Sequence, residues 1–353
     1  SGVWIMAYTT IDNPELYFQI VTYTGDGNTG RSITLPGDTD MQPDLVWLKS
    51  RGEAEHHQLT DSVRGVNKQL YSHLAYSEAT ETDRITAFNS DGFTIEDDII
   101  VNKDTIAFVA WCWKANGTGS ANTDGSISST VSANTTSGFS IVKYTGTGAN
   151  ATVGHGLGVA PKIVIIKNRD RASGWHVGGD AIGTDNQYLN LNGTDAIDSA
   201  STGFQSFSST TFGIGSDTDW NASSESIIAY CFADVPGCSK FGSYTGNGND
   251  DGPFIYTGFK PAWVMYKRTD TAGNWVLFDN KRTTFNLADD FLQADLSDAE
   301  ATSNARNRID MLSNGFKHRG DGNASNASSS TYIYMAFAEA PFVNSNGVPC
   351  NAR

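Results

Sequence analysis

The segment Gly154–Lys162, G-H-G-L-G-V-A-P-K, places alternating glycines ahead of a lysine, a composition that could serve a phosphate-binding loop. Such a loop needs a helix directly after its glycines, because backbone N–H groups and the helix N-terminus bind the anion. Here the apolar run I-V-I-I follows (Ile163–Ile166), which is typical of a strand. We therefore interpret this segment as a turn between strands rather than as a nucleotide site.

Aromatic rings and histidines near turns are the candidates for ligand binding. Three tryptophans, Trp175, Trp220 and Trp275, lie close to predicted turns, where an exposed ring can stack on a sugar. For these tryptophans the alternative is burial in the core. His56 and His57 lie on a predicted hairpin, and their alternative is a role as exposed polar turn residues.

The acidic loop Asn247–Gly252, N-G-N-D-D-G, is the candidate metal site. Ca²⁺ prefers carboxylate and carbonyl oxygens, which Asp250, Asp251 and their neighbours supply. A merely solvated loop is the alternative, and no other cofactor is predicted. Cys238 and Cys350 lie near the ends of sequence repeats, and whether they form a disulfide is left open.

Patterns typical of catalysis are not found in the sequence. It has no G-x-S-x-G nucleophile motif, no zinc-ligand spacing of Cys and His, and no E-x-D-x-x-E strand. Glycoside hydrolysis would need two carboxylates held about 5–10 Å apart, one with a raised pKa. The sequence therefore predicts a protein that is not an enzyme.

Charge and hydropathy narrow the classes of partner. The net charge is −15 and no Lys/Arg cluster occurs, so binding to nucleic acid is not expected. No apolar run is long enough to span a membrane, and the first residues lack the pattern of a secretory signal. We expect a native start at Met6 and folding in a reducing cytoplasm.

An internal repeat dominates the sequence. The motif Y-T-G-x-G occurs three times, each time followed by a proline, an apolar run and a basic end. The motif tyrosines are Tyr23, Tyr144 and Tyr244, and the prolines are Pro43, Pro161 and Pro261. Because the two markers recur at nearly the same intervals, the chain contains three copies of one unit.

Short runs rich in Val, Ile, Tyr, Phe and Trp, bounded by Gly, Asn, Asp and Pro, predict an all-β chain with little helix. The repeat predicts three tandem antiparallel β-sandwich units. Their boundaries are 1–117, 138–237 and 238–353, with a Gly/Ser/Thr/Asn-rich linker or short strand at 118–137. The third unit carries a C-terminal tail and a predicted helical insertion, Leu287–Ala301, L-A-D-D-F-L-Q-A-D-L-S-D-A-E-A.

The closing strand of each unit is predicted to be buried on both faces. In the first copy, Val109, Trp111 and Trp113 alternate with Phe108, Ala110 and Cys112, and both sets are apolar. Cys112, Cys231 and Ala336 occupy one repeat position, which predicts a small buried site rather than a reactive thiol.

The arrangement Y-T-G-T-G … V-G-H-G-L-G-V-A-P-K-I-V-I-I-K-N-R-D … W-H-V of the second copy resembles repeat domains of structural proteins from tailed bacteriophages, especially marine ones. The segments M-A-Y-T-T-I-D-N-P-E-L-Y-F and A-E-A-P-F-V-N-S-N-G-V-P-C-N-A-R are similar to the ends of the same family, so the resemblance covers Met6–Arg353. It implies jelly-roll or lectin-like sandwich domains of the concanavalin type and a virion location, and it supplies no catalytic residues.

From this resemblance we expect a non-enzymatic virion protein, a tail fibre or spike involved in host recognition through surface polysaccharide. Its expected partners are other virion proteins and sister chains, with a trimer by analogy. The alternative is a purely structural capsid-decoration or tail-assembly component without receptor binding. A polysaccharide depolymerase is the third hypothesis.

Overall fold

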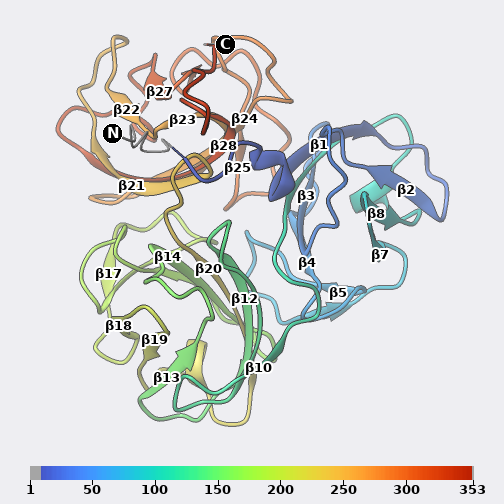
Figure 1. Cartoon of the computed structure of the whole chain (residues 1–353), viewed down its shortest axis with the longest axis vertical. Helices are drawn as coiled ribbons and strands as arrows, with labels where there is room; N and C mark the ends of the chain where they lie inside the picture. The colour runs from blue at the N-terminus through green and yellow to red at the C-terminus, as the bar shows by residue number, and fades with distance from the viewer. Residues whose placement is uncertain (1–8, 352–353) are drawn as a thin grey trace, which may run out of the picture.

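The computed structural model describes residues 9–351 and confirms the all-β fold class. Met6, like the outermost residues of the first and third predicted units, lies outside the described residues. The strands form three groups around a common centre (Figure 1). Each group contains a larger antiparallel sheet and a three-stranded one, and we call these groups the first, second and third sheet pairs.

The first sheet pair has a larger sheet of order β1-β9-β3-β4 and a smaller sheet of order β2-β8-β7. A 3₁₀ turn, η1 (Pro14–Leu16), precedes β1, one helical turn, α1 (Ile99–Asn102), precedes β9, and β5 and β6 form a separate ribbon. The strands are β1 (Phe18–Thr24), β2 (Arg31–Thr34), β3 (Leu45–Ser50), β4 (Gln58–Asp61), β5 (Lys68–Gln69), β6 (Ala79–Thr80), β7 (Ile85–Asn89), β8 (Gly92–Ile95) and β9 (Ala107–Trp113).

The second sheet pair has an eight-stranded sheet of order β10-β11-β12-β20-β14-β15-β16-β17 and a smaller sheet of order β13-β19-β18. One helical turn, α2 (Thr218–Asn221), precedes β20. The strands are β10 (Ser120–Asn122), β11 (Ser129–Asn134), β12 (Phe139–Thr145), β13 (Ala151–Gly154), β14 (Ile163–Asn168), β15 (Trp175–Gly178), β16 (Gln187–Asn190), β17 (Asp198–Ser199), β18 (Phe204–Phe207), β19 (Thr211–Ile214) and β20 (Ser226–Phe232).

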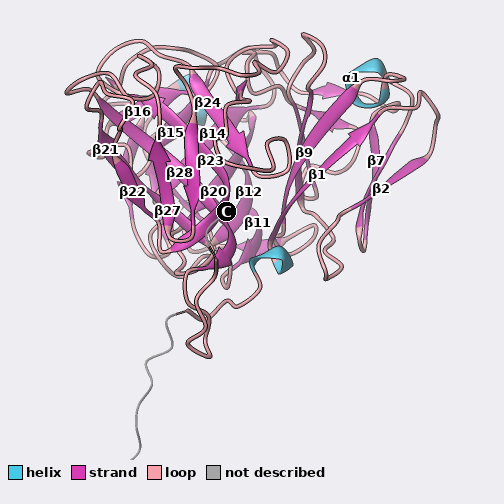
Figure 2. Ribbon diagram, turned by 90° about the horizontal axis from the view of Figure 1, so that it is seen from above, coloured by secondary structure: helices cyan, strands magenta, loops and turns pink. Residues whose placement is uncertain are grey.

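The third sheet pair has a five-stranded sheet of order β21-β28-β23-β24-β25 and a smaller sheet of order β22-β27-β26. Figure 2 shows β21, β22 and β27 together at one side of the molecule. The strands are β21 (Ser239–Thr245), β22 (Phe254–Tyr256), β23 (Phe259–Arg268), β24 (Trp275–Asp279), β25 (Leu292–Gln293), β26 (Ile309–Leu312), β27 (Gly315–His318) and β28 (Thr331–Pro341).

Strand order recurs in the three pairs. In each, the first long strand (β1, β12 or β21) pairs with the last one (β9, β20 or β28). That last strand also pairs with β3, β14 or β23, which in turn pairs with β4, β15 or β24. The register also recurs: the matched partners are Ile20↔Trp111, Ile141↔Tyr230 and Phe241↔Met335. A residue in one copy can therefore be compared directly with its counterparts in the other two.

The last long strand of each pair is buried on both faces, as alternation in the sequence predicted. In β9, Trp111 and Trp113 join a core shared by all three sheet pairs, whereas Phe108 and Cys112 join the core between the two sheets of the first pair. Cys112, Cys231 and Ala336 are all fully buried, which confirms the small core position.

The shared core lies where the three larger sheets face one another (Figure 1). Rings from different sheet pairs touch there: the centroids of Trp111 and Trp263 are 6.4 Å apart, and those of Phe232 and Phe337 are 5.9 Å apart. Each buried large apolar side chain contributes about 1.5–3 kcal/mol to folding. Because this core needs all three larger sheets, the sheet pairs stabilise one another.

The turn predicted at Gly154–Lys162 is confirmed. Gly154 ends β13 and Ile163 begins β14, so the glycines connect two strands. Gly156 and Gly158 have φ values of 69° and 76°, a left-handed conformation that favours glycine.

The helix predicted over Leu287–Ala301 is wrong. Ala288 forms a bridge with Ile309, Phe291 forms one with Ala301, and the intervening β25 pairs with β24. Ala288, Phe291 and Leu292 are buried and β25 extends the larger sheet, which outweighs the helical propensity of the segment. Among the described residues, no helix has the length and apolar composition needed to cross a membrane.

The segment 118–137, predicted as a linker or short strand, adds two strands to the second sheet pair. β10 and β11 extend the larger sheet beyond β12, with Val131 opposite Val142. Within residues 9–351, all four cysteines are free, so Cys238 and Cys350 form no disulfide.

Candidate functional site: joints between sheet pairs and an exposed aromatic face

Three of the predicted ligand-binding residues occupy one repeat position. His57 directly precedes β4, Trp175 and Trp275 are the first residues of β15 and β24, and all three are fully buried. Each ring N–H donates a hydrogen bond to a backbone carbonyl of a neighbouring sheet pair. The donors and acceptors are Trp175 Nε1 to Tyr71 O (2.8 Å), Trp275 Nε1 to Asn190 O (2.8 Å) and His57 Nε2 to Gln293 O (2.9 Å).

These three bonds run in one direction around the molecule, from the second pair to the first, from the third to the second and from the first to the third. The contacts are therefore head-to-tail and close into a ring. In His57, Nδ1 accepts from Trp47 Nε1 at 2.9 Å, which leaves Nε2 as the protonated donor. Burial holds the pKa of His57 well below its usual value.

The expectation that Trp175, Trp220 and Trp275 are exposed platforms for sugar is wrong. Their exposed fractions are 0%, 1% and 0%. Trp220 lies in α2 and packs on His176, with ring centroids 4.3 Å apart, and its Nε1 donates to Thr202 O at 3.2 Å. Turn neighbours suggested exposure, but a neighbouring sheet pair or loop covers each ring.

His56 is half-buried and faces a second histidine. Its Nδ1 lies 2.9 Å from Nε2 of His73, so one proton joins the two rings. Burial lowers the pKa of both rings, to about 4 for His73. The pair is therefore neutral at physiological pH and packs beside Tyr71.

Asp250 and Asp251 are exposed in the loop before β22. Asp251 Oδ1 forms an ion pair with Lys317 Nζ at 2.9 Å, which lowers the pKa of its carboxyl group. Residues 9–351 contain no group of three or more His, Cys, Asp and Glu side chains positioned to hold a metal ion. Calcium binding at this loop stays a prediction.

The Y-T-G-x-G motif is explained by one local structure that recurs three times. In the second copy, Tyr144 donates its hydroxyl to Trp220 O at 2.7 Å, and Asn221 accepts from Thr147 N at 2.8 Å through its side chain. A Cβ at Gly146 would lie 2.2 Å from Ala222 O, so no other residue fits there. The asparagines that bind this loop in the three copies are Asn102, Asn221 and Asn326.

A buried lysine also recurs near the ends of β3, β14 and β23: Lys49, Lys167 and Lys267. Each ammonium group donates to backbone carbonyls of the following loop or of a neighbouring one; Lys267 Nζ, for example, lies 2.8 Å from Asp195 O. Burial lowers the pKa of each to about 8. These lysines hold the loops in position.

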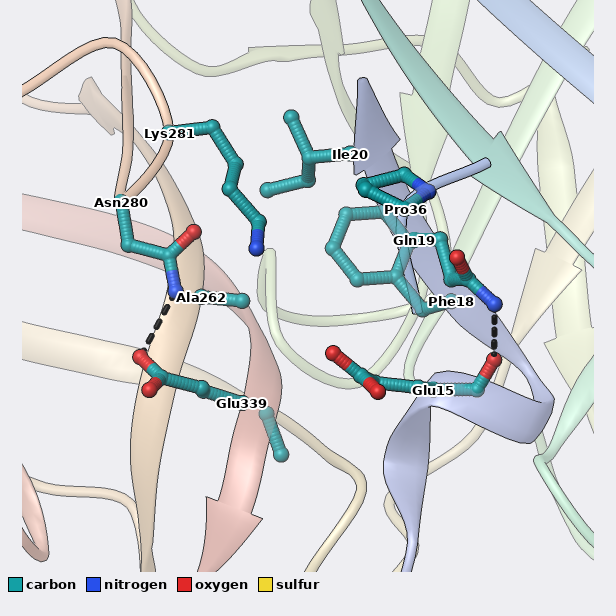
Figure 3. Close-up of a pocket in the computed structure, with 10 residues that line it drawn as sticks. Glu15, Phe18, Gln19, Ile20, Pro36, Ala262, Asn280, Lys281 and Glu339 are labelled. Carbon is teal, nitrogen blue, oxygen red and sulfur yellow. Dashed lines mark hydrogen bonds between the residues drawn. The ribbon is translucent and has the colours of Figure 1, made fainter. Parts of the chain in front are cut away.

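A small cavity lies between β1 and the third sheet pair (Figure 3). Its polar side includes Glu15, Asn280 and Glu339, and Asn280 Nδ2 donates to Glu339 Oε2 at 2.6 Å. The cavity volume is about 20 Å³, enough for a single water molecule. It is therefore too small for an organic ligand.

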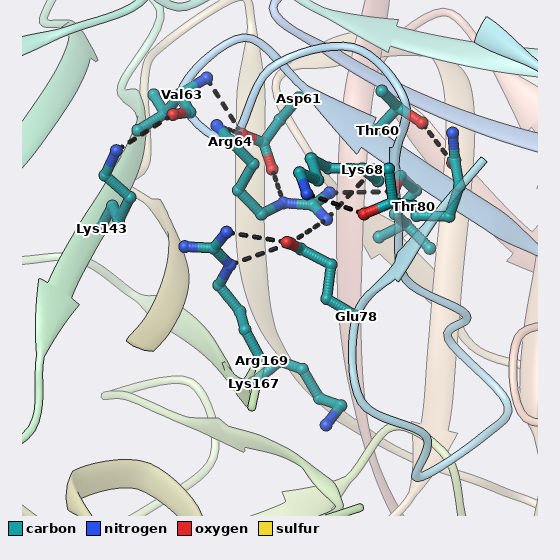
Figure 4. A network of polar contacts seen from close by, with 12 residues as sticks. Thr60, Asp61, Val63, Arg64, Lys68, Glu78, Thr80, Lys143, Lys167 and Arg169 are labelled. Carbon is teal, nitrogen blue, oxygen red and sulfur yellow. Dashed lines mark hydrogen bonds and ion pairs between the residues drawn. The ribbon is translucent and has the colours of Figure 1, made fainter. Parts of the chain in front are cut away.

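Buried ions join the first and second sheet pairs (Figure 4). Asp61 Oδ2 accepts from Arg64 Nε at 2.5 Å and from the Tyr230 hydroxyl of the second pair at 2.7 Å. Glu78 binds Arg64 at 3.1 Å and receives two hydrogen bonds of 2.8 Å from Arg169. Burial raises the pKa of Glu78, but the two arginines outweigh it and hold that pKa below its usual value.

The joint between the third and first sheet pairs repeats this arrangement. Asp279 Oδ2 accepts from Arg282 Nε at 2.5 Å and from Trp111 Nε1 at 2.9 Å. Glu300 binds Arg282 at 2.8 Å and Arg51 at 2.8 Å. Burial raises the pKa of Asp279, but the Arg282 charge and the hydrogen bonds outweigh it, so the net direction is downward.

The joint between the second and third sheet pairs has no ions at the matching positions. The backbone contact is kept, since Ile197 N donates to Thr269 O at 2.9 Å just as Glu78 N donates to Arg169 O at 2.8 Å. The residues that match Asp61, Arg64, Glu78, Arg169 and Tyr230 are, in this order, Gly179, Ile182, Ile197, Thr269 and Met335. All charged members are absent together, as expected if a buried charge left without its partner is strongly destabilising.

One surface stands apart from these joints. Phe254 and Tyr256 on β22 point outward, with exposed fractions of 45% and 60%, while Ile255 between them is buried in the third core. Across the sheet, Lys317 lies opposite Phe254 and Gly315 opposite Tyr256. We call the outward side chains of Phe254, Tyr256 and Lys317 the aromatic face.

Tyr256 also borders a surface pocket of about 450 Å³. Its other walls come from the turn between the second and third sheet pairs, the start of β21 and the link between β22 and β23; they include Asp234, Ser239, Lys240 and Thr257. Lys240 Nζ and Asp234 Oδ2 form an ion pair of 2.5 Å at its side. This is a volume typical of small-molecule sites.

The sequence interpretation missed Phe254 and Tyr256. A comparison of the three copies at this strand could have revealed them, because the first copy has R-S-I-T and the second A-T-V-G there. Only the third copy has aromatic residues at the outward positions.

The fold and the joints define a class: an all-β protein whose three repeated sheet pairs close into a ring. Residues 13–341 match a family model described as a domain of unknown function, DUF7483, and the chain belongs to that family. The single match spans all three sheet pairs, in agreement with their shared core. A search among curated proteins finds no match to this chain.

Proposed function

We propose that this protein is a non-enzymatic structural component of a tailed-phage virion, located on an external appendage such as a fibre or spike and active in host recognition. In this proposal each sheet pair is one β-sandwich unit of the jelly-roll or lectin-like type. The repeated motif Y-T-G-x-G and the segment H-G-L-G-V-A-P-K of the second copy support the phage assignment through their resemblance to repeat domains of such proteins. The recurring strand order supports the three-unit architecture.

The observation that carries the proposal is the use of the repeated residues. The tyrosine and glycine of the motif and the asparagine that binds it hold loops, and the matched His57, Trp175 and Trp275 join neighbouring sheet pairs. Residues retained in several copies therefore maintain a closed and tightly packed body. Such use is expected of a structural component, whereas the repeated residues of an enzyme would converge on a reactive group.

The location of the protein in the particle tests this proposal. Antibodies raised against the full chain should label an external tail appendage in immunogold micrographs of the phage that encodes it. Excess purified protein should also adsorb to the host and reduce infection. Absence of label on the particle would overturn the proposal.

The capsid-decoration or tail-assembly role is the second candidate, because the same closed body would suit it. It predicts label over the head or the tail base, with no adsorption of the purified protein to cells. The depolymerase hypothesis predicts new reducing ends when the protein is incubated with host polysaccharide, and our proposal predicts none.

A further inference from the structure

We propose that the aromatic face binds a neutral polysaccharide, with the rings of Phe254 and Tyr256 packing against pyranose rings. The inference rests on the proposed recognition function and gives it a place and a class of ligand. It assigns binding to the third sheet pair alone, and to exposed residues instead of the buried tryptophans.

The geometry of β22 presents both rings to solvent. β22 is an edge strand of the smaller sheet, and Phe254 and Tyr256 are separated by one residue, so they lie on the same side of the strand. A Cβ at Gly315 on the adjacent strand would lie 3.0 Å from a ring carbon of Phe254, which shows that this ring rests against bare backbone. The two rings form a short apolar track along the edge of the sheet.

The other two copies show that the fold does not need aromatic residues here. The register places Ser32 and Thr34 at the matching positions of the first sheet pair, and Thr152 and Gly154 at those of the second. All three smaller sheets nevertheless have the same strand order. Two large exposed rings in only one copy therefore point to a contact with another molecule.

Hydrogen-bonding groups lie beside one of the two rings, that of Tyr256. The pocket of about 450 Å³ beside Tyr256 is lined by Ser239, Asp234 and Lys240. Carboxylate and ammonium groups next to an aromatic ring match the alternation of C–H and O–H groups on a pyranose.

Most charged side chains near the aromatic face form ion pairs, although the chain carries a net charge of −15. Lys240 pairs with Asp234, and Lys317 pairs with Asp251 at 2.9 Å. Arg319 lies 3.4 Å from Asp310 on the same small sheet. A surface with paired charges offers no net attraction to an ion, which favours a neutral ligand.

Affinity electrophoresis of the full chain tests the inference. Native gels would contain one of four neutral polysaccharides as probe: dextran, mannan, laminarin or agarose. The wild type should be retarded by at least one of them. The variant Phe254→Ser/Tyr256→Thr, which takes the residues of the first copy, should bind at least about tenfold more weakly, because aromatic anchors dominate contact energies.

Tyr76→Thr is the matched control, since Tyr76 is 59% exposed in the first sheet pair. It should be retarded like the wild type, and circular dichroism should show all variants folded. Lack of retardation of the wild type by every probe, or equal retardation of the double variant, would overturn the inference. So would a concentration-dependent dimer that only the double variant loses, because a second copy of the chain would then be the occupant.

The outcome of this test can be distinguished from the outcome of the test of the proposed function. Immunogold label on the appendage without retardation would refute the polysaccharide site alone. Retardation without label on the particle would refute the virion assignment and leave the site standing.

Discussion

His318 provides the sharpest test of the physical interpretation. It is fully buried in the third core, and among the described residues neither ring nitrogen has a hydrogen-bond partner. The rings of Tyr244, Tyr266 and Phe316 surround it at centroid distances of 4.8, 5.1 and 5.7 Å. Burial lowers the pKa of His318 to about 3.

The perturbation is His318→Ile, because the matching residues of the first and second copies are Ile95 and Ile214. At pH 8 the variant should be more stable than the wild type by about 1–3 kcal/mol, the cost of an unsatisfied buried polar group. The neutral ring of the folded state binds no proton down to about pH 3, whereas the unfolded chain takes one up below about pH 6.5.

The part of the wild-type stability that depends on the neutral His318 ring is therefore lost as pH falls from about 6.5 toward 3. At pH 5 the loss from this one group is roughly 2 kcal/mol, so the advantage of the variant should grow by that amount. Because other titrating groups are common to both proteins, their contributions cancel in the difference.

Urea unfolding followed by tryptophan fluorescence at pH 8 and pH 5 measures this difference. The reciprocal variant Ile95→His is the control, and it should lose stability at pH 8 and lose more at pH 5. An advantage of His318→Ile that is the same at both pH values would refute the reasoning, as would a less stable variant.

Three further predictions concern the joints and the repeated loop. Arg64→Met should lower the free energy of unfolding by about 3–5 kcal/mol, and adding Asp61→Asn should restore part of it, because a buried carboxylate is then no longer unpaired; simple additivity in urea titrations would contradict this. Gly146→Ala should lower the midpoint of thermal unfolding by several degrees, since its Cβ would meet a carbonyl oxygen at 2.2 Å; an unchanged midpoint would contradict it. The isolated segment 138–237 should be aggregated or bind a hydrophobic dye, because it exposes its share of the common core; a monodisperse fragment with a sharp unfolding transition would show that the sheet pairs are independent.

Much of the strand framework could be predicted from the sequence. Alternation in Val109–Trp113 gives both faces of β9, and the repeat of Y-T-G-x-G aligns the three copies. These signals are local, because side-chain period and turn chemistry depend on neighbouring residues.

The closed ring could not be predicted in the same way. Trp175 lies next to a turn, and only the docking of a neighbouring sheet pair buries it. The segment Leu287–Ala301 has helical composition, yet its β25 pairs with β24 and becomes the edge of the larger sheet, a pairing that the sequence does not reveal. For the candidate site the limit was different, since Phe254 and Tyr256 could have been found by comparing the copies at β22.

Ring closure within one chain has a consequence for valency. A ring built from three identical chains would have to carry the same outward residues in every copy. Here the three copies differ freely, so that a single chain presents one aromatic face while the other two positions hold Ser32, Thr34, Thr152 and Gly154. Under the proposed binding role, each protein molecule offers a single aromatic face, so avidity for a repetitive polymer has to come from the number of chains displayed together and their spacing.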